Sequence, residues 1–389
     1  MYKIQEDLVQ KKIDEITAYL LSAPKNDVPS LFGDIAGRVI FMFYYGYIYN
    51  DKSFSNKAKE HLIRIFDIIN NTNNLYIHFA DGITGIQTML ILLMSDGFIS
   101  DTDFDVGDEI DDVLFQHTKH EIESYSDDFF YGYLGILYYY VIKYKYRQTL
   151  DLYSKIDAII DAIYAREFSG DDYKHKYIDL GIPHGFGSMI IILSEIFELK
   201  INQYKTKRIL DKLYSYYKPF IQEKKGYSFF PTIFEKGHTE QYIHSRLGWC
   251  YGDVSCVLAL LRYSECMDNK ELHDECINIL IDTCYRKNLN YNIIRDSCFC
   301  HGSAGLAYIY LYLYKKYKVN IFYNAHKYWL DNIFCFANHV SDGAAGFAAY
   351  VGDGYKKSDD ILSGIVGIGL VLISSITMKR YSWERLFLL

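Results

Sequence analysis

Segments of about ten residues that are almost uniformly apolar recur along the whole chain. They read GIQTMLILLM, GILYYYVIKY, GSMIIILSEIF, SCVLALLRYS, GLAYIYLYLYKKY and GIGLVLISSI. A helix that is apolar all round is a buried helix. Between these segments lie others with an apolar stripe on one face: Ile4, Leu8, Ile13, Ile16 and Leu20 in the first, and Leu152, Ile156, Ile159, Ile160 and Ile163 in another. Each period of about 50 residues therefore predicts one amphipathic helix and one buried helix.

A glycine-x-x-glycine element, in some copies degraded, precedes the buried segments. The copies are DIAG at 34–37, GITG at 82–85, GYLG at 132–135, GFGS at 185–188, GDVS at 252–255, GSAG at 302–305 and GIVG at 364–367. GAAG at 343–346 falls out of phase and is predicted to be a loop. The repeat predicts an all-α fold, an α/α toroid of seven inner and seven outer helices, with the glycine elements at the N-termini of the inner helices. Such termini present unpaired N–H groups, although glycines that serve packing alone are an equally good interpretation of any one copy.

We expect residues 1–389 to form one domain of this kind. Two intervals between glycine elements are long, and the first contains GYSFFPTIF at 226–234, which favours an extended conformation. Segments 218–247 and 318–360 are therefore candidate insertions over one mouth of the toroid.

Composition narrows the class of protein. A formal net charge of −8 argues against a nucleic-acid partner, which would require a basic face. The first residues lack the apolar core of a signal peptide, and the apolar run at 365–378 is shorter than the roughly 20 residues of a membrane span. We therefore expect a cytoplasmic protein with no membrane span. All eight cysteines lie between Cys250 and Cys335, which is typical of core residues, metal ligands or catalysts rather than of a disulfide framework.

Residues able to bind metal or move protons gather at the glycine elements. His184 precedes Gly185, Cys250 lies two residues before Gly252, and Asp128 lies four residues before Gly132; Cys300 and His301 directly precede Gly302. In a closed toroid these positions would lie near one axis. Two cysteines and one histidine would leave the fourth coordination position of zinc open, as in catalytic sites. Core packing is the competing interpretation of each cysteine, because the spacing contains no paired CxxC motif.

Three motifs resemble the lanthionine synthetase C-like family: SRLGWCYGD at 245–253, FCHGSAG at 299–305 and PHGFG at 183–187. The resemblance extends over nearly the whole chain. It implies one Zn²⁺ per chain, held by Cys250, Cys300 and His301. It also implies a catalytic histidine, a catalytic aspartate and an arginine, with two aromatic residues flanking the metal-binding cysteine. These are His184, Asp128, Arg246, Trp249 and Tyr251.

The resemblance further implies a lanthionine synthetase, a cyclase that adds cysteine thiolates to dehydroalanine or dehydrobutyrine in a lanthipeptide precursor. His184 would be the acid/base and Asp128 would orient it. Arg246 would stabilise an enolate or hold Asp128, and Trp249 and Tyr251 would shape the pocket. Since the toroid uses the whole chain, the dehydratase would be a separate protein. The expected partners are the dehydrated precursor peptide, that dehydratase and an export transporter, with the chain cytoplasmic and associated with their membrane-bound complex.

Other interpretations remain open. A relative that adds glutathione to dehydrated residues would use the same site, and a zinc-bearing scaffold would need no catalytic residues. Asp128 could serve only as a helix cap. The acidic run at 100–112 could bind Mg²⁺ and a diphosphate, as in terpene cyclases, although a solvated loop is the simpler interpretation. The chain also departs from the family pattern, with Asp253, Val254 and Ser255 where a proline–glycine step is common and Ser188 in place of a glycine.

Overall fold

The computed structural model describes residues 2–23, 28–72, 76–102, 104, 107–168, 177–238 and 242–389. These residues form fourteen α-helices, one 3₁₀ helix and four short strands. The amphipathic helices are α1 (Tyr2–Ser22), α3 (Lys52–Asn70), α5 (Asp108–Glu123), α7 (Leu150–Glu167), α9 (Gln203–Ile221), α11 (Lys270–Thr283) and α13 (Asn320–Cys335). The buried helices are α2 (Asp34–Ile48), α4 (Ile83–Ser95), α6 (Tyr133–Tyr146), α8 (Phe186–Glu198), α10 (Asp253–Cys266), α12 (Ser303–Tyr317) and α14 (Ile365–Thr377).

Each buried helix begins at one of the predicted glycine elements. In the buried helices α4, α6, α8, α10, α12 and α14, the first glycine of the element is the residue that caps the helix N-terminus. Buried and amphipathic helices alternate along the chain, seven of each among the described residues, as the sequence predicts. The out-of-phase element at 343–346 lies in a loop, also as predicted.

The glycines allow a loop to fold back on itself before each helix. A Cβ atom added at Gly132 would lie 2.2 Å from the carbonyl oxygen of Ser126, six residues upstream. At Gly252 the corresponding distance, to the Arg246 oxygen, is 2.0 Å. Gly252 also has a φ of +82°, a conformation that only glycine adopts without strain. The same loop therefore recurs, and it presents the residues just before each glycine.

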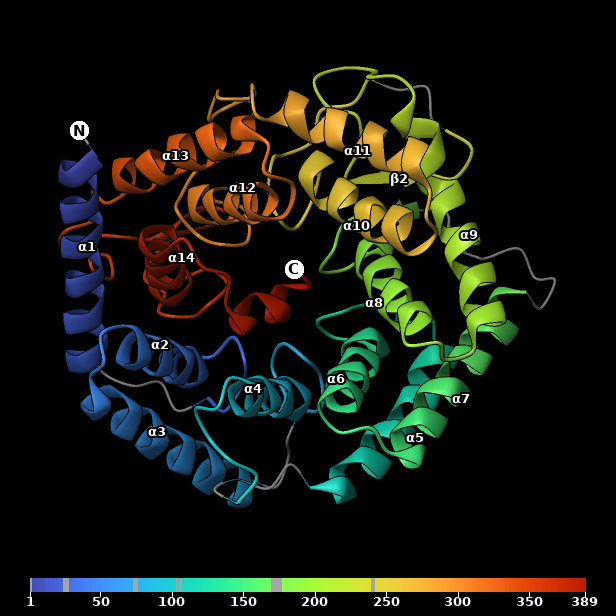
Figure 1. Ribbon diagram of the computed structural model, residues 1–389, viewed down its shortest axis with the longest axis horizontal. Helices are drawn as coiled ribbons and strands as arrows, with labels where there is room; N and C mark the ends of the chain where they lie inside the picture. The colour runs from blue at the N-terminus through green and yellow to red at the C-terminus, as the bar shows by residue number, and fades with distance from the viewer. Residues whose placement is uncertain are drawn as a thin grey trace. The chain divides into compact units, whose positions relative to one another are not determined.

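The helices group into two compact units, which are described separately. The first unit comprises Met1–Tyr76 and Cys284–Arg385, and the second comprises Ile77–Thr283 and Leu386–Leu389. In the first unit α2 packs on α3, α12 packs on α13 and α14, and α1 packs on α14 (Figure 1). In the second unit the buried helices pack in chain order, α4 on α6, α6 on α8 and α8 on α10, with α7, α9 and α11 packing against them.

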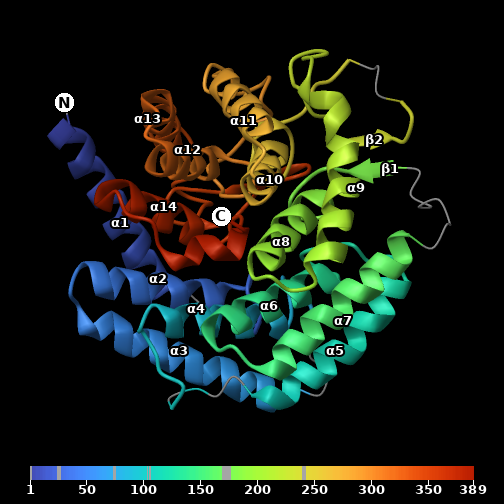
Figure 2. The same ribbon diagram turned by 45° about the vertical axis from the view of Figure 1, so that its right-hand side comes forward.

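Two short sheets interrupt the helical pattern. Strand β1 (Tyr177–Asp179) pairs antiparallel with β2 (Ile233–Glu235), so the segment predicted to be extended contributes β2 (Figure 2). Strand β3 (Ala349–Val351) pairs antiparallel with β4 (Gly354–Lys356). The second candidate insertion, 318–360, begins with helix α13, because an apolar stripe that includes Phe322, Trp329 and Ile333 packs into the core. Only its later part is extended or loop.

The acidic run at 100–112 is not entirely the solvated loop that the sequence suggests. Its residues 103, 105 and 106 lie outside the described residues, and its last five belong to α5. Asp111 is buried: it accepts a hydrogen bond from the Tyr139 hydroxyl at 2.7 Å and pairs with Lys143 Nζ at 2.7 Å. Its role is therefore to join α5 to α6.

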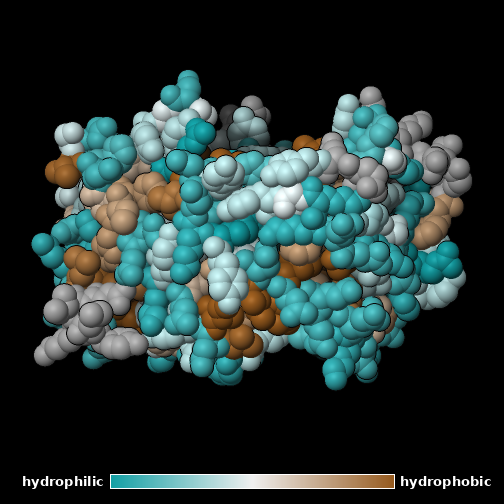
Figure 3. Space-filling model, turned by 90° about the horizontal axis from the view of Figure 1, so that it is seen from above, coloured by the Kyte–Doolittle hydropathy of each residue, from teal (hydrophilic) through white to brown (hydrophobic). Residues whose placement is uncertain are grey.

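Among the described helices, none is both long and apolar enough to cross a membrane. The face drawn in Figure 3 is mostly hydrophilic, with hydrophobic residues gathered in small groups.

Candidate functional site

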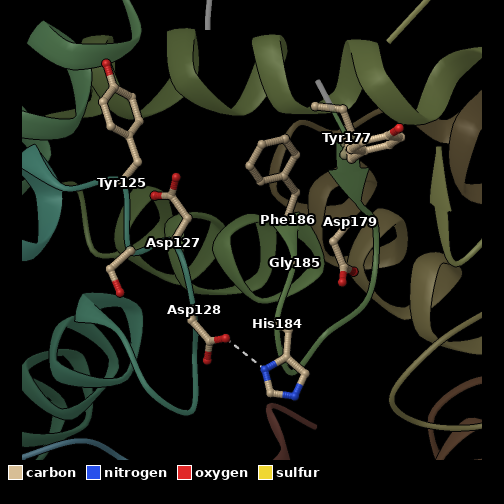
Figure 4. A pocket seen from close by; sticks show the side chains of 10 residues that line it. Tyr125, Asp127, Asp128, Tyr177, Asp179, His184, Gly185 and Phe186 are labelled. Carbon is tan, nitrogen blue, oxygen red and sulfur yellow. Dashed lines mark hydrogen bonds and ion pairs between the residues drawn. The ribbon is translucent and has the colours of Figure 1, made fainter. Parts of the chain in front are cut away.

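His184 and Asp128 form a hydrogen-bonded pair in the second unit. His184 Nδ1 lies 2.8 Å from Asp128 Oδ2 (Figure 4). The other carboxylate oxygen, Oδ1, accepts hydrogen bonds from the backbone N–H groups of Phe130 at 2.7 Å and Tyr131 at 2.8 Å. Asp128 therefore stabilises its own turn with one oxygen and orients the imidazole with the other. Gly132, not Asp128, caps helix α6.

The pair changes the acidity of the imidazole. The hydrogen bond to Asp128 raises the pKa of His184 above its ordinary value of 6.5, burial opposes this rise, and the negative charges of Asp128, Asp179 and Cys250 add to it. Because Nδ1 points at the carboxylate, Nε2 is the atom that can give or take a proton. The ring of Tyr131 stacks on the imidazole with centroids 6.2 Å apart and planes 7° apart, which restricts its orientation.

This pair lines a cavity of about 280 Å³. Figure 4 shows side chains from the loop before α6, from β1 and from the start of α8 around it. The lining residues are Tyr125, Ser126, Asp127, Asp128, Tyr177, Ile178, Asp179, His184, Gly185 and Phe186. The cavity is large enough for one or two amino-acid side chains but not for a folded partner.

Asp179 is a residue of this cavity that the sequence analysis missed. Its Oδ1 accepts the N–H of Gly181 at 2.7 Å, and its Oδ2 accepts the Tyr251 hydroxyl at 3.3 Å. Burial raises the pKa of its carboxyl group. A signal was present: Asp179 lies six residues before Gly185, as Asp296 lies six before Gly302. Tyr251, predicted to shape the pocket, reaches it through this hydrogen bond.

Trp249 is fully buried and acts through packing. Its ring stacks on Phe130, with centroids 5.9 Å apart, and its Nε1 donates to the Phe387 carbonyl oxygen at 2.9 Å. It therefore joins the loop that carries Asp128 to the loop that carries Cys250. The structure gives it no place on the cavity wall.

Cys250 is buried and its backbone is tied to the loop of His184. The Cys250 carbonyl oxygen accepts hydrogen bonds from Ile182 N at 3.2 Å and Ser255 Oγ at 3.0 Å. Nearby, Asp253 Oδ1 accepts the N–H groups of Phe229 at 2.9 Å and Phe230 at 2.8 Å. The residues that replace the family's proline–glycine step thus hold the Cys250 loop in place themselves.

Cys300 and His301 lie together in the first unit, directly before α12. The backbone N–H of Cys300 donates to the Leu362 carbonyl oxygen at 3.1 Å. His301 Nε2 faces the buried Asp296 Oδ2 at 3.6 Å. A carboxylate at one ring nitrogen is the usual companion of a metal-binding histidine, and it leaves Nδ1 as the ligand atom. Cysteine thiolates and a neutral imidazole are the donor types that zinc prefers, so these residues fit that ion.

A third cysteine of the same loop, Cys298, needs to be distinguished from Cys300. Its thiol is buried, and its Sγ accepts the N–H of His301 at 3.4 Å. Asp296, Cys298 and His301 place one potential ligand atom each within 4.8 Å of one another. The first unit therefore holds a group of metal-capable side chains, and two of its cysteines are candidates.

In the described part of the chain, the hydrogen bonds of the Asp128 carboxylate are made with Phe130, Tyr131 and His184, and none joins it to Arg246. The Arg246 carbonyl oxygen packs against Gly252, and among the described residues its guanidinium group makes no hydrogen bond or ion pair. Its predicted role stays a prediction.

Comparisons with known proteins agree with this description. Residues 29–388 match the family model described as "Lanthionine synthetase C-like protein". No curated protein sequence matches the chain. A solved structure titled "Nisin cyclase" aligns with 100% of this chain and 98% of its own, with a TM-score of 0.74 and 17% sequence identity. That likeness is one of fold, and it confirms the predicted all-α toroid class. The chain therefore belongs to the lanthionine synthetase C-like family, the enzyme class that its motifs predict.

Proposed function

We propose that this chain is a zinc-dependent peptide cyclase that forms lanthionine and methyllanthionine rings. Its substrate is a lanthipeptide precursor in which serine and threonine have been converted to dehydroalanine and dehydrobutyrine. The observation that carries the proposal is the His184–Asp128 pair, 2.8 Å apart on the wall of a cavity, in a chain of this family. An oriented imidazole beside a cavity of side-chain size suits proton transfer to a bound peptide.

In this proposal Cys250, Cys300 and His301 hold one Zn²⁺. The donor set and the Asp296 carboxylate behind His301 support it. A bound zinc ion would supply an acidified peptide thiol, because coordination of a thiol removes its proton. Three protein ligands leave one position for that sulfur.

The protein side chains act on the dehydrated residue that the thiolate attacks. The cysteine sulfur bonds to the β-carbon, the double-bond electrons move toward the carbonyl as an enolate, and the α-carbon then takes a proton. His184 delivers that proton from Nε2, while Asp128 stabilises the charged imidazolium. The thiol loses one proton and the α-carbon gains one, so the mass of the peptide is unchanged. In this proposal Arg246 stabilises the enolate oxygen when substrate is bound.

The partners follow from the same proposal. The chain acts in the cytoplasm on a precursor already dehydrated by a separate enzyme, and it associates with the membrane-bound complex that modifies and exports the peptide. Tyr177 and Phe186 on the cavity wall offer aromatic surface for the substrate.

The test is incubation of the purified protein with a chemically dehydrated, cysteine-containing peptide. We expect free peptide thiols to disappear at unchanged peptide mass. A parallel reaction contains glutathione: a mass increase by one glutathione, with ring closure absent, would show thiol addition rather than cyclisation. If zinc-loaded protein carries out neither reaction, the cyclase proposal is excluded and a scaffold role is favoured.

A matched pair of variants tests the metal ligands. Cys300→Ala should lose both zinc and cyclisation, whereas Cys298→Ala, two residues away in the same loop, should keep both. His184→Ala should keep zinc and lose cyclisation, because it removes the proton donor and no ligand. Normal cyclisation by His184→Ala would contradict the proposed acid.

A further inference from the structure

Two histidines and a glutamate converge in the second unit, on elements that the cyclase proposal does not use. His117 and Glu121 stand four residues apart on α5, so both project from one face of the helix. His78 comes from the loop before α4. His117 Nε2 lies 2.9 Å and His78 Nε2 lies 3.3 Å from the same oxygen, Glu121 Oε1.

The spacing of these atoms is that of a metal coordination shell. All three potential ligand atoms lie within 4.8 Å of one another. Ligands that bind zinc at about 2.0–2.2 Å in a tetrahedral arrangement are roughly 3.3 Å apart. The side chains would therefore need to shift only by fractions of an ångström to bind an ion.

The residue next to this cluster supports the same interpretation. Asp81 Oδ1 lies 3.5 Å from Nδ1 of His78, on the side of the ring away from Glu121. A carboxylate there fixes the tautomer of a histidine so that its other nitrogen can bind metal. His78 thus has an acidic residue behind it and a carboxylate oxygen in front, as His301 has Asp296 behind it.

An independent observation comes from the second oxygen of Glu121. Glu121 is 6% exposed, and its Oε2 is buried with no hydrogen-bond partner among the described residues. Leaving a buried carboxylate oxygen without a donor is unfavourable, and such groups call for an explanation. A cation bound by this carboxylate would satisfy both oxygens, whereas ion pairs with two histidines leave one oxygen unsatisfied.

We propose that His78, His117 and Glu121 form a second metal site, which binds a divalent transition-metal ion such as Zn²⁺. Two imidazoles and one carboxylate, without sulfur, distinguish it chemically from the cysteine-containing set. His117 is 39% exposed, so the ion can enter from solvent and keep water on its remaining positions. The site stands on its own residues and does not depend on the cyclase activity.

The ion would also hold the loop that carries His78 in place beside the candidate active site. The ring of Tyr131 meets the His78 ring edge-on at 6.3 Å and stacks on the His184 ring. Binding at His78 would therefore fasten the loop before α4 to helix α5, and Tyr131 lies between His78 and His184. The geometry gives the site a positioning role rather than contact with substrate.

The test uses metal-stripped full-length protein titrated with Co²⁺, which substitutes for zinc and reports its ligands by its spectrum. We expect the wild-type protein to bind two equivalents, with sulfur-to-cobalt charge-transfer absorption from one of them. Glu121→Gln should lose one equivalent while keeping that absorption. Cys300→Ser should do the reverse, keeping one equivalent with nitrogen and oxygen ligands only.

A control variant separates this result from general effects of removing a histidine. His273→Ala removes an imidazole that lies 3.6 Å from Asp274 and belongs to none of the three-residue metal-capable groups among the described residues, so this variant should bind two equivalents. His117→Ala should behave like Glu121→Gln. If Glu121→Gln and His117→Ala, both folded by circular dichroism, bind as much Co²⁺ as the wild-type protein, the second site is excluded. The loss of one equivalent from wild type to Glu121→Gln is expected whether or not the protein cyclises peptides, so failure of the cyclase proposal would not remove it.

Discussion

His184 and Asp128 belong to loops before successive buried helices, and their side chains meet at 2.8 Å between Nδ1 and Oδ2. Asp128 is fixed by its own loop, whereas His184 is held by residues of the Asp128 loop. Asp128 Oδ1 is fixed by two backbone N–H groups, and His184 is stacked by Tyr131. These contacts hold the imidazole through Nδ1 and through its ring face. Nε2, the atom that transfers the proton, takes no part in the hydrogen bond to Asp128.

The raised pKa of His184 predicts a pH dependence. The carboxylate stabilises the imidazolium, so the proton donor is present at low pH and is lost as the pH rises through the raised pKa. Asp128→Asn removes the largest cause of that rise. We therefore expect the falling limb of the cyclisation rate to move to lower pH in this variant.

The check is the pH profile together with an NMR titration of the His184 ring. Both should shift in the same direction, and a limb that stays in place would mean that another group supplies the proton. The same pair stabilises the folded state below the ordinary histidine pKa and ceases to do so above the raised one. Since the His184 side chain is 38% exposed, this contribution is screened by solvent.

Gly252→Ala should damage both folding and metal binding. Any Cβ there would lie 2.0 Å from the Arg246 oxygen, and φ is +82°. We expect a loss of unfolding free energy well above the ~1–2 kcal/mol of conformational strain alone, with a reduced zinc content. Gly97→Ala is the control, because its φ is +75° and no atom of the described residues lies within 4 Å of the added atom. Equal losses in urea denaturation would refute the steric explanation.

Ser255→Ala should loosen the Cys250 loop. Ser255 Oγ accepts Ile182 N at 3.1 Å and donates to the Cys250 oxygen at 3.0 Å. Its loss should cost about 1–3 kcal/mol, because buried groups lose a partner. Ser264→Ala, in the same helix, removes a buried hydroxyl whose hydrogen bond among the described residues is to the Leu261 carbonyl, and it should cost less. Comparable losses in the two variants would show that Ser255 has no special role in this loop.

Asp111 and Lys143 predict a third stability effect. Both are buried and 2.7 Å apart, so Asp111→Ala leaves a buried cation and should cost about 3–5 kcal/mol. The double variant Asp111→Asn/Lys143→Met removes both charges and keeps an acceptor for the Tyr139 hydroxyl. It should recover most of the loss in chemical denaturation. A double variant as unstable as Asp111→Ala would point to packing instead.

The sequence predicts the helices well because their signal is repeated. Seven glycine elements mark where the buried helices begin, and at Gly132, Gly185, Gly252, Gly302 and Gly364 the close approach of other atoms leaves no room for a side chain. A single apolar stripe along one helix predicts less reliably which residues are buried. In α1 the sequence suggests Leu8 as a core residue, yet Leu8 is 47% exposed and Val9 is buried, because Val9 continues the spacing of Ile13, Ile16 and Leu20.

The site is predicted less completely than the fold. Motif residues such as His184 and Asp128 are identified by type and position, but Asp179 depends on the pairing of β1 with β2, two segments far apart in the chain. The burial of Asp111 and the convergence of His78 on α5 likewise depend on how helices pack. Periodicity along one segment carries no information on such contacts.

The recurring loop before each buried helix has a consequence for engineering. Leu362 and Ser363 occupy, before Gly364, the positions that Cys300 and His301 occupy before Gly302. Both glycines adopt nearly the same backbone angles, with φ of −105° and −106° and ψ of −170° and −171°. A cysteine–histidine pair could thus be introduced at the equivalent positions of this copy without new backbone geometry. The repeated loops therefore make the chain a scaffold in which reactive side chains can be moved from one equivalent position to another.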